Sequence, residues 1–103
     1  MAVASALKDQ GAPHNPDAEV ATLGALLLNP EAIPEVIQFI RPEDFYNGRN
    51  RRVLGAILSL YNRGDAIDLI TVTDELKNHG ELEPAGGASY VVSLTSAVPT
   101  SAN

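Results

Sequence analysis

Apolar side chains recur at helical spacing through most of this sequence, and each run ends at a glycine or a proline. The longest run lies between Arg49 and Asn62, and its members form one wide stripe on a helix: Val53, Leu54, Ile57, Leu58 and Tyr61. Alternating patterns typical of strands are almost absent. The chain therefore has to bury several amphipathic helices against one another.

Two Asn-Pro pairs mark helix starts, because Asn accepts hydrogen bonds from free backbone N–H groups and Pro fits the first turn. The first helix should begin after Asn15, with Val20, Leu23, Leu27 and Leu28 as its apolar stripe. The second should begin after Asn29, with the stripe Ile33, Val36, Ile37 and Ile40. Arg41-Pro42 should close it, since the residue before proline is driven out of the helical region.

The later segments are read in the same way. Residues 42–48 predict a helical turn that inserts Phe45 into the core, and Gly64 and Gly80 supply left-handed residues at two helix ends. Residues 71–74 (Thr-Val-Thr-Asp) match a helix-start pattern, so Ile67–Ile70 should be extended or turning. A last helix should follow Gly86-Gly87, with Tyr90, Val91, Leu94 and Val98 inward, and stop at Pro99.

These patterns predict an all-α fold: a compact orthogonal bundle of about five helices plus short helical turns. At 103 residues the chain forms one domain. Residues 1–13 should be a disordered N-terminal arm, and residues 14–103 the folded domain. The predicted core is Leu23, Leu27, Phe45, Leu54, Ile57, Leu58, Tyr61, Leu76, Tyr90 and Leu94.

Composition excludes several classes of protein. There is no cysteine, so disulfides and Cys-ligated zinc are unavailable. No signal peptide and no apolar run of roughly 18 residues is present, so we expect a cytoplasmic protein without membrane contact. Seven Lys and Arg against thirteen Asp and Glu give a net charge of −6, which disfavours binding to a phosphate backbone.

Motifs of enzyme chemistry are missing from the sequence. Neither lysine follows a glycine as a phosphate-binding P-loop requires, and His14 and His79 are too far apart for metal-ligand spacing. The acidic pairs Asp65 with Asp68 and Asp74 with Glu75 fit helix caps and solvated faces better than acid–base catalysis. We therefore predict no catalytic, cofactor-binding or metal-binding residue in this chain.

The candidate partner face consists of Arg49, Arg51 and Arg52 with Tyr46. Three arginines in the first turn of a helix oppose its dipole by roughly 0.3–1 kcal/mol each. Glu43 and Asp44 just upstream offer local compensation, and otherwise the arginines face a partner. Tyr46 fits an interface rim, where tyrosine is common.

Six short blocks carry a family resemblance: Pro13-His14-Asn15 with Ala18-Glu19, Leu23–Leu27, Pro42–Tyr46, Ile67–Val72, Gly86-Gly87 with Tyr90, and Val98–Asn103. In this order they resemble the N-terminal domain of the bacterial replicative DNA helicase of the DnaB type. Pro16, Val20 and the arginines of residues 49–52 depart from the family pattern, which often has an apolar residue, Gln and a His-Arg pair there. The arginines keep the positive charge but lose a titratable group.

The resemblance implies a hexameric, ATP-driven helicase that encircles single-stranded DNA at the replication fork. ATP and Mg would bind in a separate motor domain that is absent here. The N-terminal domains of the family associate into a collar that helps to dock the primase. A helicase loader is a further possible partner, and the chain should stop before a C-terminal helical hairpin.

Two other readings stay open. A small helical nucleic-acid-binding module would use Arg49, Arg51 and Arg52 as a phosphate clamp. A small enzyme would need a pocket in which carboxylates converge.

Salt dependence separates the nucleic-acid reading from the docking reading. We predict weak or no binding of single-stranded DNA by this domain, because its net charge is −6. Fluorescence anisotropy between about 50 and 200 mM salt measures this directly. Tight binding at low salt that falls steeply over this range would support the phosphate clamp instead.

Overall fold

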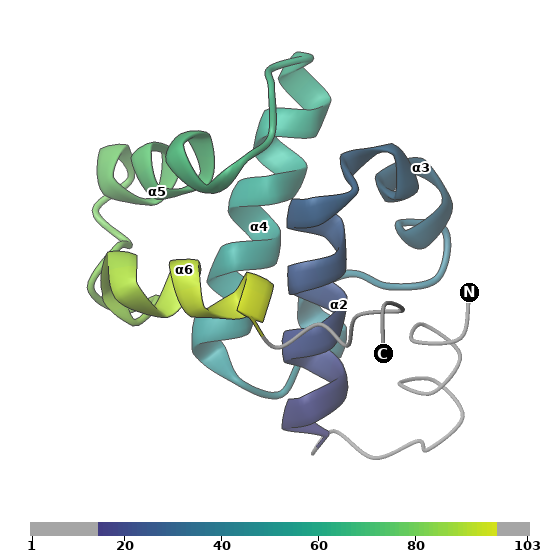
Figure 1. The fold of residues 1–103 in the computed structure, drawn as a ribbon, viewed down its shortest axis with the longest axis horizontal. Helices are drawn as coiled ribbons and strands as arrows, with labels where there is room; N and C mark the ends of the chain where they lie inside the picture. Colours follow the sequence, from purple (N-terminus) through teal and green to yellow (C-terminus); the bar gives the residue numbers. More distant parts are fainter. Residues whose placement is uncertain (1–14, 97–103) are drawn as a thin grey trace.

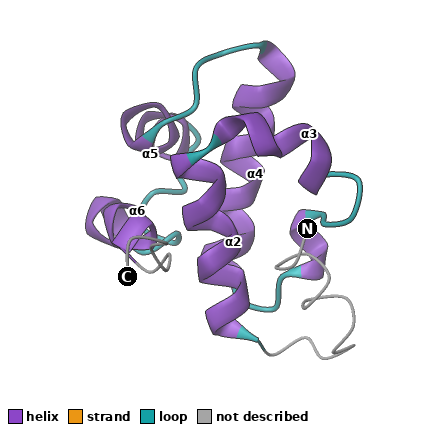
Figure 2. Ribbon diagram, turned by 45° about the vertical axis from the view of Figure 1, so that its right-hand side comes forward, coloured by secondary structure: helices purple, strands orange, loops and turns teal. Residues whose placement is uncertain are grey.

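The computed structural model describes residues 15–96, and every regular element in this range is helical (Figures 1 and 2). Five α-helices run in the order α2 (Pro16–Leu28), α3 (Ile33–Val36), α4 (Gly48–Arg63), α5 (Leu69–Asn78) and α6 (Gly87–Ser96). Two short 3₁₀ turns, η1 (Pro30–Ala32) and η2 (Pro42–Asp44), join them. The predicted all-α fold is confirmed. The predicted arm and the stop after Val98 lie outside the described residues.

The longest helix, α4, occupies the middle of the bundle and runs beside α2, while α5 and α6 cross this pair at a steep angle (Figure 1). Helix α6 packs mainly on α2, and α5 packs mainly on α4. The η2 turn also packs on α4. No helix among residues 15–96 is long and apolar enough to span a membrane.

The core lies where α2, α4, α5 and α6 meet. Of the predicted core residues, seven are buried there: Leu23, Leu27, Phe45, Leu54, Ile57, Leu76 and Leu94. Leu58, Tyr61 and Tyr90 are only half-buried and pack against the core from its edge. Full burial of a Leu or Ile side chain contributes about 1.5–3 kcal/mol, so this cluster supplies most of the driving force for folding.

The helix predicted after Asn29 is much shorter than its apolar stripe suggested. The η1 turn leads into α3, which ends at Val36. The chain then forms a tight turn, in which the Phe39 N–H donates to the Val36 carbonyl at 2.9 Å. Bonds of this i→i+3 type turn the chain more sharply than an α-helix does. Ile40 consequently reaches the core from a turn, and Leu28 at the end of α2 is exposed rather than inward.

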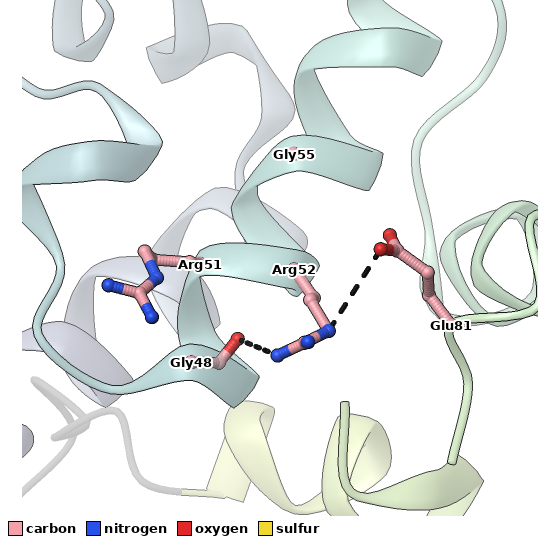
Figure 3. Close-up of a pocket in the computed structure, with 5 residues that line it drawn as sticks. All are labelled: Gly48, Arg51, Arg52, Gly55 and Glu81. Carbon is pink, nitrogen blue, oxygen red and sulfur yellow. Dashed lines mark hydrogen bonds and ion pairs between the residues drawn. The ribbon is translucent and has the colours of Figure 1, made fainter. Parts of the chain in front are cut away.

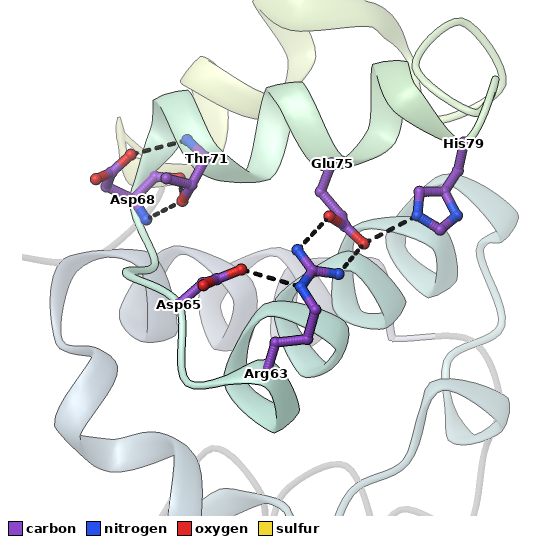
Figure 4. A network of polar contacts seen from close by, with 6 residues as sticks. All are labelled: Arg63, Asp65, Asp68, Thr71, Glu75 and His79. Carbon is purple, nitrogen blue, oxygen red and sulfur yellow. Dashed lines mark hydrogen bonds and ion pairs between the residues drawn. The ribbon is translucent and has the colours of Figure 1, made fainter.

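Helix α5 begins earlier than residues 71–74 suggested. Asp68 is its N-cap: the Asp68 carboxylate accepts from the Thr71 N–H, and the Thr71 hydroxyl accepts from the Asp68 N–H, both at 2.9 Å (Figure 4). This reciprocal pair satisfies two backbone donors at once, so it outcompetes the later start signal. Leu69 and Ile70 are therefore helical, which corrects the extended segment predicted there.

Other helix ends follow the prediction. Asn15 caps α2 by accepting from the Ala18 N–H at 3.1 Å, with Pro16 in the first turn. Gly64 and Gly80 end α4 and α5 with positive φ angles of 76° and 68°. Gly86 has φ +101°, and a Cβ built there would lie 2.8 Å from the Tyr90 Cβ. Only glycine fits this approach to α6.

Gly86→Ala should therefore destabilise the fold by about 2 kcal/mol or more, since the alanine backbone is strained at positive φ and its Cβ also collides with Tyr90. Gly55→Ala is the matched control: a Cβ at this α4 position has nothing within 4 Å. It should stabilise the fold by roughly 0.5–1 kcal/mol through helix propensity. Urea unfolding of both variants measures the two changes, and equal effects would contradict this account.

Candidate docking surface

The N-terminus of α4 carries all of the predicted partner-face residues. Asn47 caps the helix by accepting from the Arg49 N–H at 2.9 Å, and the first turn contains no acidic residue. Tyr46, just before the cap, is 56% exposed. The docking surface is defined here as Tyr46, Arg49, Arg51 and Arg52.

The three arginines do not converge. Arg49 places its guanidinium 5.3 Å from the centre of the Tyr90 ring, a cation–π contact with α6. Arg51 Nη1 donates to the carbonyl of Phe45 at 3.4 Å. Arg52 leaves α4 on the opposite side from Arg51 and folds back, so that its Nη1 donates to the Gly48 carbonyl at 3.1 Å (Figure 3). The predicted cluster is thus spread around one helical turn.

Charge compensation for these arginines is weak. Arg52 Nε lies 3.9 Å from Glu81 Oε2 and has no hydrogen-bond partner in the structure. Among the described residues, neither Arg49 nor Arg51 forms an ion pair with a carboxylate. Asp44, an expected compensating acid, accepts instead from the Arg41 N–H at 2.9 Å. Positive charge therefore remains at a helix end where the dipole disfavours it.

A shallow hollow of about 260 Å³ lies beside Arg52. Its lining is Gly48, Arg51, Arg52, Gly55 and Glu81 (Figure 3). Gly48 leaves the room for this arrangement, because a Cβ there would lie 3.1 Å from Arg52 Nη1. The hollow is open and polar, and its size suits side chains of a partner better than an enclosed small molecule.

Sequence reasoning missed a buried polar cluster beneath this surface. Glu19, which the sequence indicates only as part of a family block, is 1% exposed, and Asn50 is fully buried. Glu19 Oε2 accepts from the Tyr46 N–H at 2.6 Å, and Glu19 Oε1 accepts from Asn50 Nδ2 at 2.9 Å. A signal was available, since Glu19 and Asn50 precede Leu23 and Leu54 by one helical turn and so lie on the apolar faces of their helices.

Tyr90 completes the cluster from α6. Its hydroxyl donates to Asn50 Oδ1, so Asn50 links all three helices α2, α4 and α6. Burial raises the pKa of Tyr90 above its ordinary value of 10, and the negative charge of Glu19 raises it further, while Arg49 opposes the shift. The hydroxyl therefore stays protonated and available as a donor at neutral pH.

A second polar network closes the other end of α4 (Figure 4). Arg63 donates to both oxygens of Glu75, at 2.7 and 3.1 Å, and to Asp65 at 2.9 Å. His79 Nε2 lies 3.1 Å from Glu75. Hydrogen bonds from Arg63 hold the pKa of Glu75 below its ordinary value of 4.5 and raise the pKa of Arg63. The network joins α4 to α5.

Ser59, Glu75 and His79, which are residue types that hydrolases use, line one hollow of about 180 Å³. Within the described residues Ser59 has no hydrogen bond to His79, and Glu75 is already held by Arg63 through two bonds. No group of three metal-ligating side chains is found in residues 15–96.

Comparison with known proteins settles the family. Residues 11–103 match the family described as DnaB-like helicase N terminal domain. The chain belongs to this family. The replicative DNA helicase DnaB of Leifsonia xyli is 50% identical over 91 residues, and the replicative DNA helicase DnaC of Bacillus subtilis is 42% identical over 97 residues. These matches cover 88% and 94% of this chain.

A solved structure agrees with the sequence matches. The N-terminal domain of DnaB helicase from Mycobacterium tuberculosis superposes with a TM-score of 0.81 at 45% identity, covering 88% of this chain and 63% of that one. Against the full-length relatives the chain is short, since it spans 20% of the Leifsonia protein and 21% of the Bacillus protein. The DnaB-type resemblance and the helical fold are confirmed together.

The Arg63–Glu75 pair predicts a pH dependence of stability. The folded state lowers the pKa of Glu75, so the stabilisation is complete above its ordinary pKa of 4.5 and is lost as the pH falls through the folded-state value. Glu75→Gln should lower the Tm at neutral pH, and the difference from the wild type should shrink below about pH 4.5. Thermal unfolding followed by circular dichroism at several pH values checks this. Asp74→Asn, an exposed neighbour on α5, is the control.

Proposed function

We propose that this chain is the assembly and docking domain of a replicative, ATP-dependent helicase that unwinds duplex DNA at the bacterial replication fork. The observation that carries the proposal is a match over residues 11–103 to the N-terminal domain family, in a sequence that contains no phosphate-binding P-loop. ATP and Mg would accordingly be bound by another part of the parent protein. The parent would work as a cytoplasmic hexamer.

The primase is the proposed docking partner, with self-association in the parent ring and a helicase loader as further contacts. The docking surface has the composition of a binding hot spot, where Tyr and Arg are enriched. Tyr46 is half exposed, and its backbone N–H donates to the buried carboxylate of Glu19. Arg51 donates to the Phe45 carbonyl but forms no ion pair with a carboxylate of the described residues. An acidic patch on the partner would supply the missing carboxylates.

Direct binding of DNA by this domain is the less favoured alternative. Arg49 lies over the Tyr90 ring and Arg52 donates to the Gly48 carbonyl, so two of the three arginines are already engaged within the domain. Glu81 lies 3.9 Å from Arg52, and the whole chain carries −6. Single-stranded DNA would meet the parent ring rather than this domain.

Calorimetric titration of the full-length helicase with the helicase-binding domain of its cognate primase tests the proposal. Tyr46→Ala and Arg51→Ala should each weaken binding by about tenfold or more, as expected of hot-spot side chains. Ile70→Ala removes an exposed apolar side chain from α5 and should leave the affinity unchanged. Undiminished primase binding by a helicase that lacks residues 14–103 would sink the docking role.

A further inference from the structure

The carboxylate of Glu19 is buried without a cation. Glu19 is 1% exposed, and no Arg, Lys or His among the described residues forms an ion pair with its carboxylate. Three donors surround it instead: the N–H of Tyr46 at 2.6 Å, the N–H of Asn47 at 3.4 Å and Asn50 Nδ2 at 2.9 Å. All three donors belong to the start of α4 or to the residues just before it.

Removing a carboxylate from water costs several kcal/mol even after the surroundings relax. Packing of α2 against α4 alone would be served as well by an apolar side chain, which carries no such cost. What a carboxylate adds is two strong acceptors on one rigid group. Glu19 thereby accepts from two consecutive backbone N–H groups, those of Tyr46 and Asn47, which precede the helix and have no helical acceptor.

The backbone that Glu19 holds is the one that presents the docking surface. Phe45 is buried at 1% exposure, whereas the next residue, Tyr46, is 56% exposed, so the chain crosses from core to surface within one residue. Arg51 donates to the Phe45 carbonyl in the same segment. The directions of Tyr46 and Arg51 therefore both depend on where this backbone lies.

The same carboxylate also reaches Arg49 through two side chains. Asn50 donates to Glu19 and accepts from the Tyr90 hydroxyl, which fixes the ring of Tyr90. That ring lies 5.3 Å from the Arg49 guanidinium. A continuous series of contacts thus runs from Glu19 to Arg49, and three of the four docking-surface residues are held by one buried group.

We propose that Glu19 is a positioning residue of the docking surface, which it holds in its binding geometry through the Tyr46–Asn47 backbone and through Asn50 and Tyr90. The surface is then ordered before a partner arrives, and binding loses less conformational entropy. This inference rests on the proposed docking function. It assigns Glu19 no contact with the partner.

A double-mutant cycle in the full-length helicase separates positioning from mere stability. Glu19→Ala should weaken binding of the primase's helicase-binding domain by about tenfold, yet by less than about threefold when Tyr46 is already alanine. Positioning through Tyr46 requires this loss of effect. Equal effects of Glu19→Ala in both backgrounds would overturn the proposal.

Two further variants complete the design. Glu19→Gln should bind more tightly than Glu19→Ala but less tightly than the wild type, because its amide oxygen can still accept from the Tyr46 N–H, while its NH₂ group leaves the Asn47 N–H without an acceptor. Leu76→Ala, which opens a cavity beneath α5 and destabilises the fold, should leave affinity unchanged at a temperature where the variant stays folded. Loss of affinity in Leu76→Ala equal to that in Glu19→Ala would show that stability alone matters.

Hydrogen exchange on this chain gives a readout that needs no partner. The Tyr46 amide should exchange at least about tenfold faster in Glu19→Ala than in the wild type. In Leu76→Ala its exchange should not be accelerated more than that of other amides. Unchanged exchange at Tyr46 would overturn the positioning role while leaving docking intact. Absence of primase binding by the wild-type helicase would instead remove the proposed function, and this inference with it.

Discussion

Helix α4 gives α2, α5 and the η2 turn a surface on which to bury their apolar side chains. Its buried residues Val53, Leu54, Ile57 and Leu60 face α2 on one flank and α5 on the other. Neither α2 nor α5 is long enough to be stable alone in water, because helices of fewer than about 12–15 residues are marginal there. The bundle therefore forms around α4, and both polar networks of the domain lie at its two ends.

These two networks have different physical roles. At the C-terminal end the half-exposed Arg63 binds the buried Glu75 and the exposed Asp65, and this bridge ties α4 to α5. At the N-terminal end Glu19, Asn50 and Tyr90 lie largely inside the protein, where each hydrogen bond is expensive to break. The buried network thus fixes the start of α4, and this is where the proposed docking surface lies.

Membership of the DnaB-like helicase N terminal domain family gives the difference between the two polar networks a functional meaning. The chain matches about a fifth of the length of the helicases it resembles, and under the proposed function nucleotide chemistry would belong to the rest of a parent protein. The chain's own contribution has to come from surfaces that hold their shape. Uncompensated arginines and a half-exposed tyrosine above a rigid polar cluster meet that requirement.

Local patterns in the sequence were sufficient to predict the class of fold. The stripe of α4, the Asn15 cap and the glycines at 64 and 80 are local signals that neighbours in the chain satisfy, so they could be predicted without a structure. Tertiary structure decided the rest. The α5 start moved to Asp68 through a side-chain pair, and the stripe of residues 33–40 reached the core by turns. Above all, local spacing places Glu19 on the apolar face of its helix, but its partners Tyr46 and Asn50 lie 27 and 31 residues away, and no local pattern encodes contacts at that separation.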